Sequence, residues 1–170
     1  MAKPFIRADR IKKRVKALAR QISRDYKGKK LVLVGVLKGA FIFLSDLSRA
    51  LTIPAEIDFV QISSYGASRA SSGITRIKKD IDLPLTGKHV LIVEDIVDFG
   101  YTMKYLMGSL AAKKPKSIRI CALLDKPSRR AVEVPVAYRG FEVPDEFLVG
   151  YGLDFNECYR TAPDIRSIGK

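Results

Sequence analysis

The chain has 170 residues, and 47% of them are hydrophobic, which is enough apolar material for the core of one domain. With 31 Lys and Arg against 18 Asp and Glu, its net charge of +13 should attract polyanions such as nucleic acid, phosphorylated metabolites or a membrane surface. The two isolated cysteines and the single histidine exclude a disulfide framework and leave almost nothing for a zinc centre or a Ser/His/Asp triad.

No part of the sequence is typical of a membrane span or a secretory signal. The longest apolar stretch, residues 31–44, is interrupted by Lys38 and is shorter than the roughly 20 residues that a membrane helix needs. The basic N-terminus lacks the apolar segment and the cleavage site of a secretory signal. We therefore expect a cytoplasmic protein with no membrane partner.

The first predicted element is an amphipathic helix within residues 10–30. Ile11, Val15, Leu18 and Ile22 recur at helical spacing and would face the core. The pattern favours a solvated basic face over a dedicated nucleic-acid surface. The basic residues that fall largely on other faces are Lys12, Lys13, Lys16, Arg20 and Arg24.

The next segments predict the first α/β unit. Residues 29–37 form a nearly continuous apolar run and residues 40–51 have a helical pattern, which is typical of a strand buried on both faces and a return helix. Residues 56–64 predict another strand. The segment from Ser64 to Gly73 is small, polar and rich in Ser, so we predict a mobile loop, because it buries too little apolar area to offset the entropy of ordering it.

The second half of the predicted sheet follows. Residues 74–85 look like a partly exposed strand that ends at Pro84. Residues 89–93 and 117–124 predict two buried strands, and the helical pattern of residues 101–113 between them completes a second βαβ crossover. The chain is therefore predicted to be an α/β protein with a mostly parallel sheet.

Three acidic residues follow a buried strand in the stretch VLIVEDIVDFGYTM, namely Glu94, Asp95 and Asp98. Ligands of open α/β folds bind at the carboxyl ends of parallel strands. Ionised carboxylates accept hydrogen bonds from vicinal hydroxyls, so these acids suit a sugar. Two carboxylates about 4 Å apart repel each other by about 1 kcal/mol in water and by more in a poorly screened site, so we expect a cation, and Mg²⁺ fits.

The helix that begins between Phe99 and Thr102 suits a phosphate. Its first turn presents unpaired backbone N–H groups and the positive end of the helix dipole. Gly100 lets the backbone approach closely, and the Thr102 hydroxyl adds a donor. A phosphorylated sugar could therefore lie across the acids and the helix start.

A simpler interpretation of this stretch stays open. Asp98 would be the helix N-cap, and Glu94 and Asp95 would be a solvated loop at a strand end. The nucleotide motifs G-x-x-x-x-G-K-[ST] and G-x-G-x-x-G do not occur in the chain, which removes the two commonest other phosphate-binding motifs.

The same stretch resembles the phosphoribosyl pyrophosphate signature of type I phosphoribosyltransferases, and the chain looks like a member of the bacterial hypoxanthine (hypoxanthine-guanine) group. The resemblance covers nearly the full length, because its motifs occur in the family's order. These are VGVLKGAFIFLSDL, SSYG, the signature itself, LLDKPSRR and VPDEFLVGYGLDFNE. It implies one domain over residues 1–170, a central, mostly parallel sheet flanked by helices, and a small hood over the purine formed by parts of residues 126–170 and the N-terminus.

The reaction that the resemblance implies belongs to purine salvage. Ribose 5-phosphate would pass from phosphoribosyl pyrophosphate to N9 of hypoxanthine or guanine, giving IMP or GMP and pyrophosphate, with Mg²⁺ as cofactor. Members of the family are usually homodimers or homotetramers. Nucleic acid would not be a partner.

The resemblance also implies roles for the residues of the signature. Glu94 and Asp95 would bind the ribose hydroxyls, directly or through Mg²⁺, and Asp98 would be the base near purine N7. The 5-phosphate would be held by the backbone of Asp98, Phe99, Gly100, Tyr101 and Thr102 and by the Thr102 hydroxyl. Phe99 and Tyr101 replace a small residue and a lysine of many relatives, so side-chain help to the phosphate should be weaker here.

Purine recognition falls to the later motifs. Lys126 matches the lysine that donates to purine O6, where the amino group of adenine would face a donor with a donor. Phe147 would stack on the base, the Leu148 backbone would meet its edge, Asp154 would ligate Mg²⁺ and Arg160 would reach pyrophosphate. From the pattern alone, Phe147 and Asp154 would be a core aromatic and a turn acid.

Two loops and one arginine complete the implied site. Lys38 and Gly39 match the family's first loop, in which a non-proline cis peptide positions backbone groups for pyrophosphate. Ser64 and Tyr65 match the start of the long loop that closes over the reacting centre. Arg130 would support the pyrophosphate region or a subunit interface.

Two rival interpretations stay open. The wider family includes nucleic-acid-binding regulators that kept the signature, and the charge of +13 permits such a role. Lys126 and the purine segment, PDEFLVGYGLDFNE at residues 144–157, argue against it. A sister transferase that prefers xanthine or a pyrimidine is also compatible with the motifs.

Overall fold

The computed structural model describes residues 4–64 and 75–169. A mixed sheet with the strand order β3-β2-β1-β4-β5-β6 forms its centre, and all neighbouring pairs except β2 and β3 are parallel. The mostly parallel α/β fold is thus confirmed. The elements are α1 (Ala8–Asp25), β1 (Leu31–Leu37), α2 (Phe41–Ala50), β2 (Glu56–Ser64), β3 (Thr75–Lys79), β4 (His89–Val97), α3 (Tyr101–Ala111), β5 (Ser117–Asp125), the 3-10 helix η1 (Pro127–Arg129), β6 (Val136–Glu142), β7 (Leu148–Val149) and β8 (Arg166–Ser167).

The order in which the crossovers add strands to the sheet reverses between β1 and β4. From β1 the chain crosses through α2 to β2 on one side, and from β4 it crosses through α3 to β5 on the other. The strands β1 and β4 pair in parallel from Leu31 with His89 to Gly35 with Val93. Such a reversal opens a crevice at the strand ends, which is where ligands of doubly wound sheets bind.

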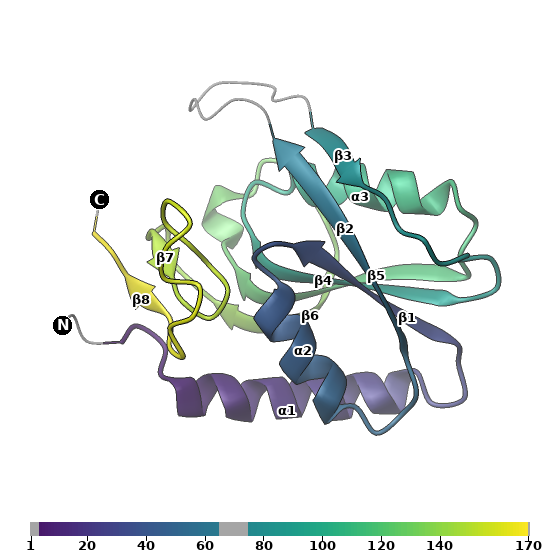
Figure 1. The fold of residues 1–170 in the computed structure, drawn as a ribbon, viewed down its shortest axis with the longest axis horizontal. Helices are drawn as coiled ribbons and strands as arrows, with labels where there is room; N and C mark the ends of the chain where they lie inside the picture. Colours follow the sequence, from purple (N-terminus) through teal and green to yellow (C-terminus); the bar gives the residue numbers. More distant parts are fainter. Residues whose placement is uncertain (1–3, 65–74, 170) are drawn as a thin grey trace.

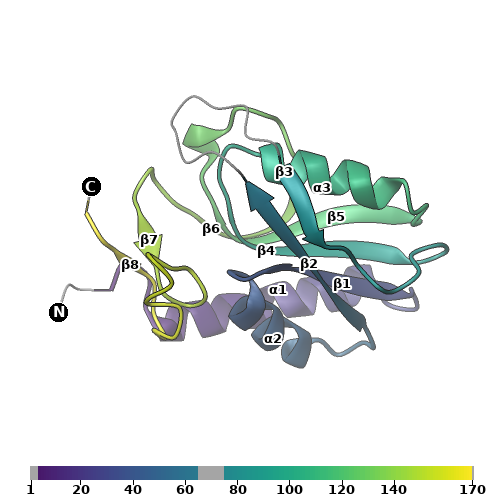
Figure 2. The ribbon, with the colours of Figure 1, turned by 45° about the horizontal axis from the view of Figure 1, so that its top comes forward.

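The helices lie on both faces of the sheet, as Figures 1 and 2 show. Leu33 and Leu91 belong to the core that α1 and α2 cover, whereas the alternate residues Val34 and Ile92 belong to the core beneath α3. Strands buried on both faces explain why β1 and β4 read as continuous apolar runs. In α1, the predicted apolar positions are buried and the five basic residues expected on other faces are exposed, which confirms the amphipathic helix.

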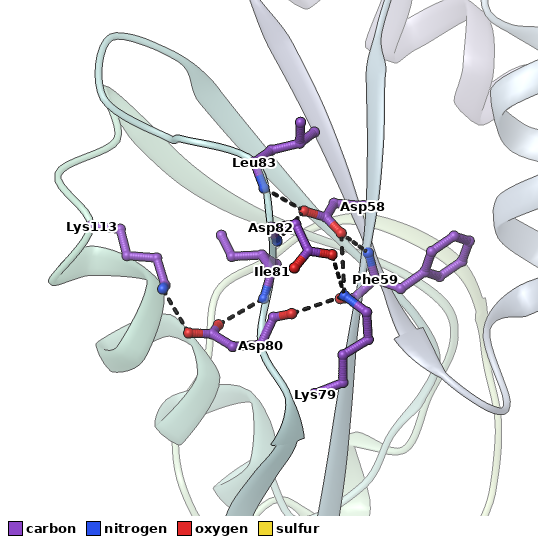
Figure 3. Close-up of polar contacts among 8 residues, drawn as sticks. All are labelled: Asp58, Phe59, Lys79, Asp80, Ile81, Asp82, Leu83 and Lys113. Carbon is purple, nitrogen blue, oxygen red and sulfur yellow. Dashed lines mark hydrogen bonds and ion pairs between the residues drawn. The ribbon is translucent and has the colours of Figure 1, made fainter.

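The predicted strand over residues 74–85 is shorter than expected, since β3 ends at Lys79 and not at Pro84. Asp58 on β2 is the cause (Figure 3). Its carboxylate accepts hydrogen bonds from the backbone N–H groups of Asp82 at 2.7 Å and Leu83 at 2.8 Å. The Lys79 ammonium lies 3.7 Å from the same carboxylate. These contacts turn the backbone toward Asp58 and end the strand ladder.

Two other elements differ from the expectations. Residues after Val134 read only as short apolar runs, yet β6 pairs in parallel with β5 and forms the sheet edge. Ser64, predicted to begin a loop, is the last residue of β2 and pairs with Thr75. The rest of that predicted loop, Tyr65 included, lies outside the described residues.

The C-terminal segment forms a separate small sheet of β7 and β8. Ile165, just before β8, pairs with Ile6, so both ends of the described chain meet beside this sheet (Figure 1). Tyr151 donates a hydrogen bond from its hydroxyl to Asp46 of α2 at 2.6 Å, which anchors the segment to the main core. Among the described helices, none is both long and apolar enough to cross a membrane.

Candidate active site

Glu94 and Asp95 lie at the carboxyl end of β4, where β4 runs between β1 and β5. They belong to the strand itself, so the interpretation of a solvated loop is wrong. Glu94 is only 7% exposed. Burial and the Asp95 carboxylate raise the pKa of Glu94 well above its usual value, and burial also raises the pKa of Asp95. A buried acid pair of this kind favours a ligand that brings hydroxyl donors or a cation.

The loop between β1 and α2 lies directly against Asp95. A Cβ atom added to Gly39 would overlap the Asp95 carboxylate, so this position accepts a side chain only if the carboxylate moves. Gly152 packs on Gly39 in turn, because a Cβ atom there would overlap the Gly39 carbonyl oxygen. The Leu37–Lys38 peptide bond, which opens this loop, is cis, and this matches the feature that the resemblance implied.

Gly100 caps helix α3, so the interpretation of Asp98 as the N-cap is wrong. Gly100 has φ of 93°, a left-handed conformation that favours glycine, and among the described residues no side chain caps the helix. The first-turn N–H groups of Tyr101 and Thr102 are therefore free of a capping side chain, and they suit an anion. Phe99 and Tyr101 have side chains that are 45% and 59% exposed, respectively.

Two consecutive arginines hold Asp98. The Nε atom of Arg129 lies 2.9 Å from Asp98 Oδ1, and Arg130 donates from Nε to the Asp98 carbonyl oxygen at 3.0 Å. Burial raises the pKa of the Asp98 carboxyl, and the positive charges of Arg129 and Lys126 oppose this effect. Asp98 is therefore a half-buried acid whose charge depends on its cationic neighbours, as a candidate general base requires.

Through its contact with the Asp98 carbonyl, Arg130 supports the turn before α3. It also forms an ion pair with Asp125, the fully buried last residue of β5. Arg139 of β6 pairs with the same carboxylate, with 2.7 Å between Nε and Oδ2. This buried cluster links the ends of β5 and β6 to the start of α3. No local pattern in the sequence points to Asp125 or Arg139, because they lie on different strands that only the fold brings together.

Lys126 follows β5 and is 6% exposed. Its backbone N–H donates to the Val97 carbonyl at 2.9 Å, and its ammonium donates to the Glu146 carbonyl at 2.7 Å. Lys126 thus ties the end of β4 to the segment that leads into β7. It is a buried cation beside Asp98, as the positive charge it exerts on that carboxyl indicates.

An aromatic side chain is exposed in the same segment. Phe147 is 48% exposed, and its ring meets that of Phe155 edge to face with 5.6 Å between centroids. Leu148 follows in β7, where its side chain is buried and its backbone pairs with Ser167. Phe147 is therefore neither a core residue nor fully solvated, so the interpretation of a core aromatic is wrong.

The third group of predicted residues gathers around Arg160. Its guanidinium lies 2.9 Å from Asp154 and 3.4 Å from Glu157, and Glu157 also pairs with Lys38 at 3.0 Å. The contact with Lys38 lowers the pKa of Glu157. The positive charge of Arg160 also acts on Asp95. Ion pairs through Glu157 and Arg160 thus bring Lys38 and Asp154 together near the acid pair, and Glu157 is an addition that the sequence did not suggest.

The acidic residues fit Mg²⁺ as an ion that arrives with a phosphorylated ligand. Carboxylate oxygens of Glu94, Asp95 and Asp154 are ligands that Mg²⁺ prefers. Within residues 4–64 and 75–169, no three acidic, His or Cys side chains are arranged to hold a metal by themselves. Mg²⁺ usually keeps several waters and binds one or two carboxylates together with substrate phosphates. Burial and the neighbouring Asp95 carboxylate raise the pKa of Glu94, and the positive charge of an ion would offset this repulsion.

The chain is similar in sequence to known phosphoribosyl transferases. Residues 6–156 match the model of the phosphoribosyl transferase domain. A hypoxanthine phosphoribosyltransferase from Salmonella typhimurium is 48% identical over 160 residues, which cover 93% of this chain and 90% of that protein. A hypoxanthine-guanine phosphoribosyltransferase from Mycobacterium avium is 45% identical over 171 residues, which cover 97% and 83% of the two chains.

Solved structures show the same relationship. A hypoxanthine-guanine phosphoribosyltransferase from Bacillus anthracis, with a HEPES molecule in its active site, has a TM-score of 0.94 and 44% identity over 99% of both chains. A hypoxanthine phosphoribosyltransferase from Staphylococcus aureus also reaches a TM-score of 0.94, at 40% identity over 99% of this chain and 91% of that chain. With its α/β fold and its acidic strand end, the chain belongs to the phosphoribosyl transferase family of enzymes.

Proposed function

We propose that this enzyme transfers ribose 5-phosphate from phosphoribosyl pyrophosphate to N9 of hypoxanthine or guanine, forming IMP or GMP and pyrophosphate. One observation carries the proposal: the buried Glu94 and Asp95 pair, the uncapped start of α3 and the buried Lys126 ammonium meet at the ends of β4 and β5. The relatives named as hypoxanthine and hypoxanthine-guanine phosphoribosyltransferases support the choice of a 6-oxopurine.

The sugar and its phosphate would lie along the strand end. Glu94 and Asp95 accept hydrogen bonds from the ribose hydroxyls, and the N–H groups from Phe99 to Thr102 bind the 5-phosphate. The exposed rings of Phe99 and Tyr101 carry no charge, so the backbone and the Thr102 hydroxyl supply this contact.

The purine would lie between the buried cation and the exposed ring. The Lys126 ammonium donates to O6, Phe147 stacks on the base, and the backbone at Leu148 meets the edge of the ring. Adenine is disfavoured because its amino group would point a donor at a donor, which leaves both groups unpaired.

The transfer itself breaks the bond from C1 to the pyrophosphate oxygen and forms the bond from C1 to N9. Positive charge develops at C1 and negative charge on the leaving group, and Lys38 and Arg160 stabilise the departing pyrophosphate. The Asp98 carboxylate takes the proton from purine N7 as N9 bonds to carbon. A bound Mg²⁺ ion, held by Glu94, Asp95 or Asp154, would add Lewis-acid stabilisation of the leaving phosphates.

The proposal extends to the organisation of the chain. Residues 1–170 would act as one domain, in which the segment after Lys126 and the N-terminal residues form a hood over the purine. The pairing of Ile6 with Ile165 and the contact of Lys126 with Glu146 support this arrangement. Light scattering on the purified protein would test the homodimer or homotetramer that the resemblance implies.

A panel of purines tests the function. The protein is incubated with phosphoribosyl pyrophosphate, Mg²⁺ and hypoxanthine, guanine, xanthine or adenine, and nucleotide and pyrophosphate are measured together. We expect both products with hypoxanthine or guanine, in equal amounts, and neither with adenine. Turnover of xanthine alone, or of no purine, would contradict the proposal.

A further inference from the structure

Arg129 contacts three residues, which belong to two segments of the candidate site. Its Nε atom lies 2.9 Å from the Asp98 carboxylate, and its Nη1 atom lies 2.8 Å from the carboxylate of Asp145. Its guanidinium also lies over the Phe99 ring, 4.4 Å from the centroid. Asp98 and Phe99 belong to the turn before α3, whereas Asp145 belongs to the segment that leads to Phe147. Arg129 therefore links the turn to the purine segment.

The residues after Arg129 contact the same turn differently. The backbone N–H groups of Ala131 and Val132 donate to the Phe99 carbonyl at 3.1 and 3.0 Å, and Arg130 donates to the Asp98 carbonyl. These contacts fix the backbone of the turn. Arg129 acts instead on the two side chains, the Asp98 carboxylate and the Phe99 ring.

We propose that Arg129 is a positioning residue for the transfer reaction, which couples the purine segment at Asp145 to the orientation and charge of Asp98. This inference rests on the proposed function, since it assigns to Asp98 the contact with purine N7. Arg129 does not touch the purine in the proposed arrangement. It acts through Asp98, whose carboxylate it holds on one side.

The charges around Asp98 give this role a measurable consequence. The cations that face it are Arg129, Lys126 and Arg130, and Asp145 is the acid that faces it. Burial raises the pKa of Asp98, and Arg129 is the strongest of the opposing groups. Loss of Arg129 therefore raises this pKa further, so a larger fraction of Asp98 is protonated at a given pH and cannot accept a proton.

The variants Arg129→Gln, Arg129→Lys and Asp145→Asn separate the contacts. Gln removes the charge. Lys keeps the charge but lacks the planar fork that lets one arginine bridge two carboxylates and stack on Phe99. Asp145→Asn weakens the link of Arg129 to the purine segment and removes the negative charge that Asp145 exerts on Asp98. Arg49→Gln is the matched control, because Arg49 is a largely exposed arginine of α2 that lies 4.0 Å from Asp46.

We expect Arg129→Gln to lower kcat for IMP formation about tenfold and to move the acid limb of the kcat/KM profile to higher pH. The KM for phosphoribosyl pyrophosphate should change by less than about twofold. Arg129→Lys should restore the acid limb but only part of kcat. Asp145→Asn should raise the KM for hypoxanthine, and its effect should largely vanish in the Arg129→Gln background, because the pair is then already broken. Arg49→Gln should match the unaltered protein in all measurements.

Three results would overturn the inference. These are an unchanged pH profile in Arg129→Gln, additive effects of the two substitutions, and a fall in kcat that Arg129→Lys does not relieve at all. If Arg129→Gln does not fold, the Lys and Asn variants test the same coupling through their kinetics. Failure of the unaltered protein to form nucleotide would overturn the proposed function itself, whereas normal turnover with an unaffected Arg129→Gln variant would overturn only this inference.

Discussion

The Lys126 ammonium donates a hydrogen bond to the backbone carbonyl of Glu146, with 2.7 Å between Nζ and O. One cation therefore joins the end of β5 to the start of the segment that carries Phe147. A lysine at only 6% exposure must form hydrogen bonds to tolerate burial, and Glu146 supplies only one acceptor for its three N–H groups. A purine oxygen would supply another. In the proposed arrangement, Lys126 would therefore link purine recognition to the placement of the Phe147 ring.

Substitution of Lys126 by Gln tests this link. Gln keeps a donor but loses the charge, and a charged hydrogen bond contributes about 1.5–3 kcal/mol. We therefore expect kcat/KM for hypoxanthine to fall by a factor of about 10 to 100, with most of the change in the KM for the purine. Lys104→Gln, at an exposed position of α3, is the control and should leave the kinetics unchanged. An unaltered purine KM in Lys126→Gln would show that the ammonium does not bind the base.

Substitution of Asp98 by Asn separates catalysis from binding. Asn has nearly the same shape and leaves the backbone contact with Arg130 in place, but it accepts no proton. Loss of a general base lowers turnover by about 10² to 10⁴, so we expect kcat to fall within that range. The dissociation constant for phosphoribosyl pyrophosphate, measured by calorimetry, should change by less than about threefold.

Two further measurements bear on Asp98. The acid limb of the pH profile should lie above the usual range of an aspartate, because burial raises the pKa of Asp98, and the limb should disappear in Asp98→Asn. Asp82→Asn, at a side chain that is 84% exposed, is the control. Equal losses of turnover and of phosphoribosyl pyrophosphate affinity would argue against the base role.

Much of the fold could be predicted because the buried strands have a recognisable apolar pattern in the sequence. β1 and β4 are covered on both faces, so each is a continuous apolar run, and the acids that follow such a run in β4 had to lie at a strand end. β6 could not be predicted in this way. It is an edge strand in which Tyr138 is the only buried residue, and Gly140 interrupts it where a Cβ atom would overlap the Leu123 carbonyl. Its place depends on contacts with β5 that no local pattern reveals.

The site residues also differ in whether a local sequence pattern reveals them. The sequence pattern predicts Glu94 and Asp95 as site residues because they directly follow an apolar run, whereas only the family resemblance indicates Lys126. The ion pairs of Arg129 with Asp98 and of Glu157 with Lys38 join residues far apart in the sequence. Such pairs are set by how the loops after parallel strands converge, and the spacing of residues along the chain does not encode them.

The Asp58 cluster predicts a stability effect that is separate from catalysis (Figure 3). Burial acts to raise the pKa of Asp58, but hydrogen bonds from the backbone of Leu83, Phe59 and Asp82, together with Lys79, outweigh it and lower the pKa. Asp58→Ala leaves these N–H groups without their acceptor. We expect the free energy of unfolding in urea at pH 7 to fall by about 2–3 kcal/mol. Asp9→Ala, in a solvated pair with Arg7, should change it by less than about 0.5 kcal/mol.

The contribution of Asp58 to stability should change with pH in a defined direction. Because folding lowers the pKa of Asp58, its contribution is complete above the unfolded value of about 3.9 and is lost as the pH falls through the lower folded value. The difference in unfolding free energy between the unaltered protein and Asp58→Ala should therefore be constant above pH 5 and shrink below about pH 4. A difference that grows toward acid pH would contradict the assignment.

Gly39 offers a test of the acid pair that does not alter any charge. A Cβ atom on Gly39 would overlap the Asp95 carboxylate, so Gly39→Ala forces Asp95 to move. We expect calorimetry with phosphoribosyl pyrophosphate and Mg²⁺ to show at least tenfold weaker binding, since a displaced carboxylate no longer meets the ribose or the ion. In the unaltered protein, removal of Mg²⁺ with a chelator should weaken the same binding, and the two effects should be less than additive.

Gly108→Ala is the matched control for Gly39→Ala, because a Cβ atom at Gly108 meets no described atom within 4 Å. This variant should bind phosphoribosyl pyrophosphate normally. Since alanine favours the helix, it should also gain about 0.5–1 kcal/mol of stability. Normal binding by Gly39→Ala would mean that Asp95 takes no part in holding the sugar or the ion.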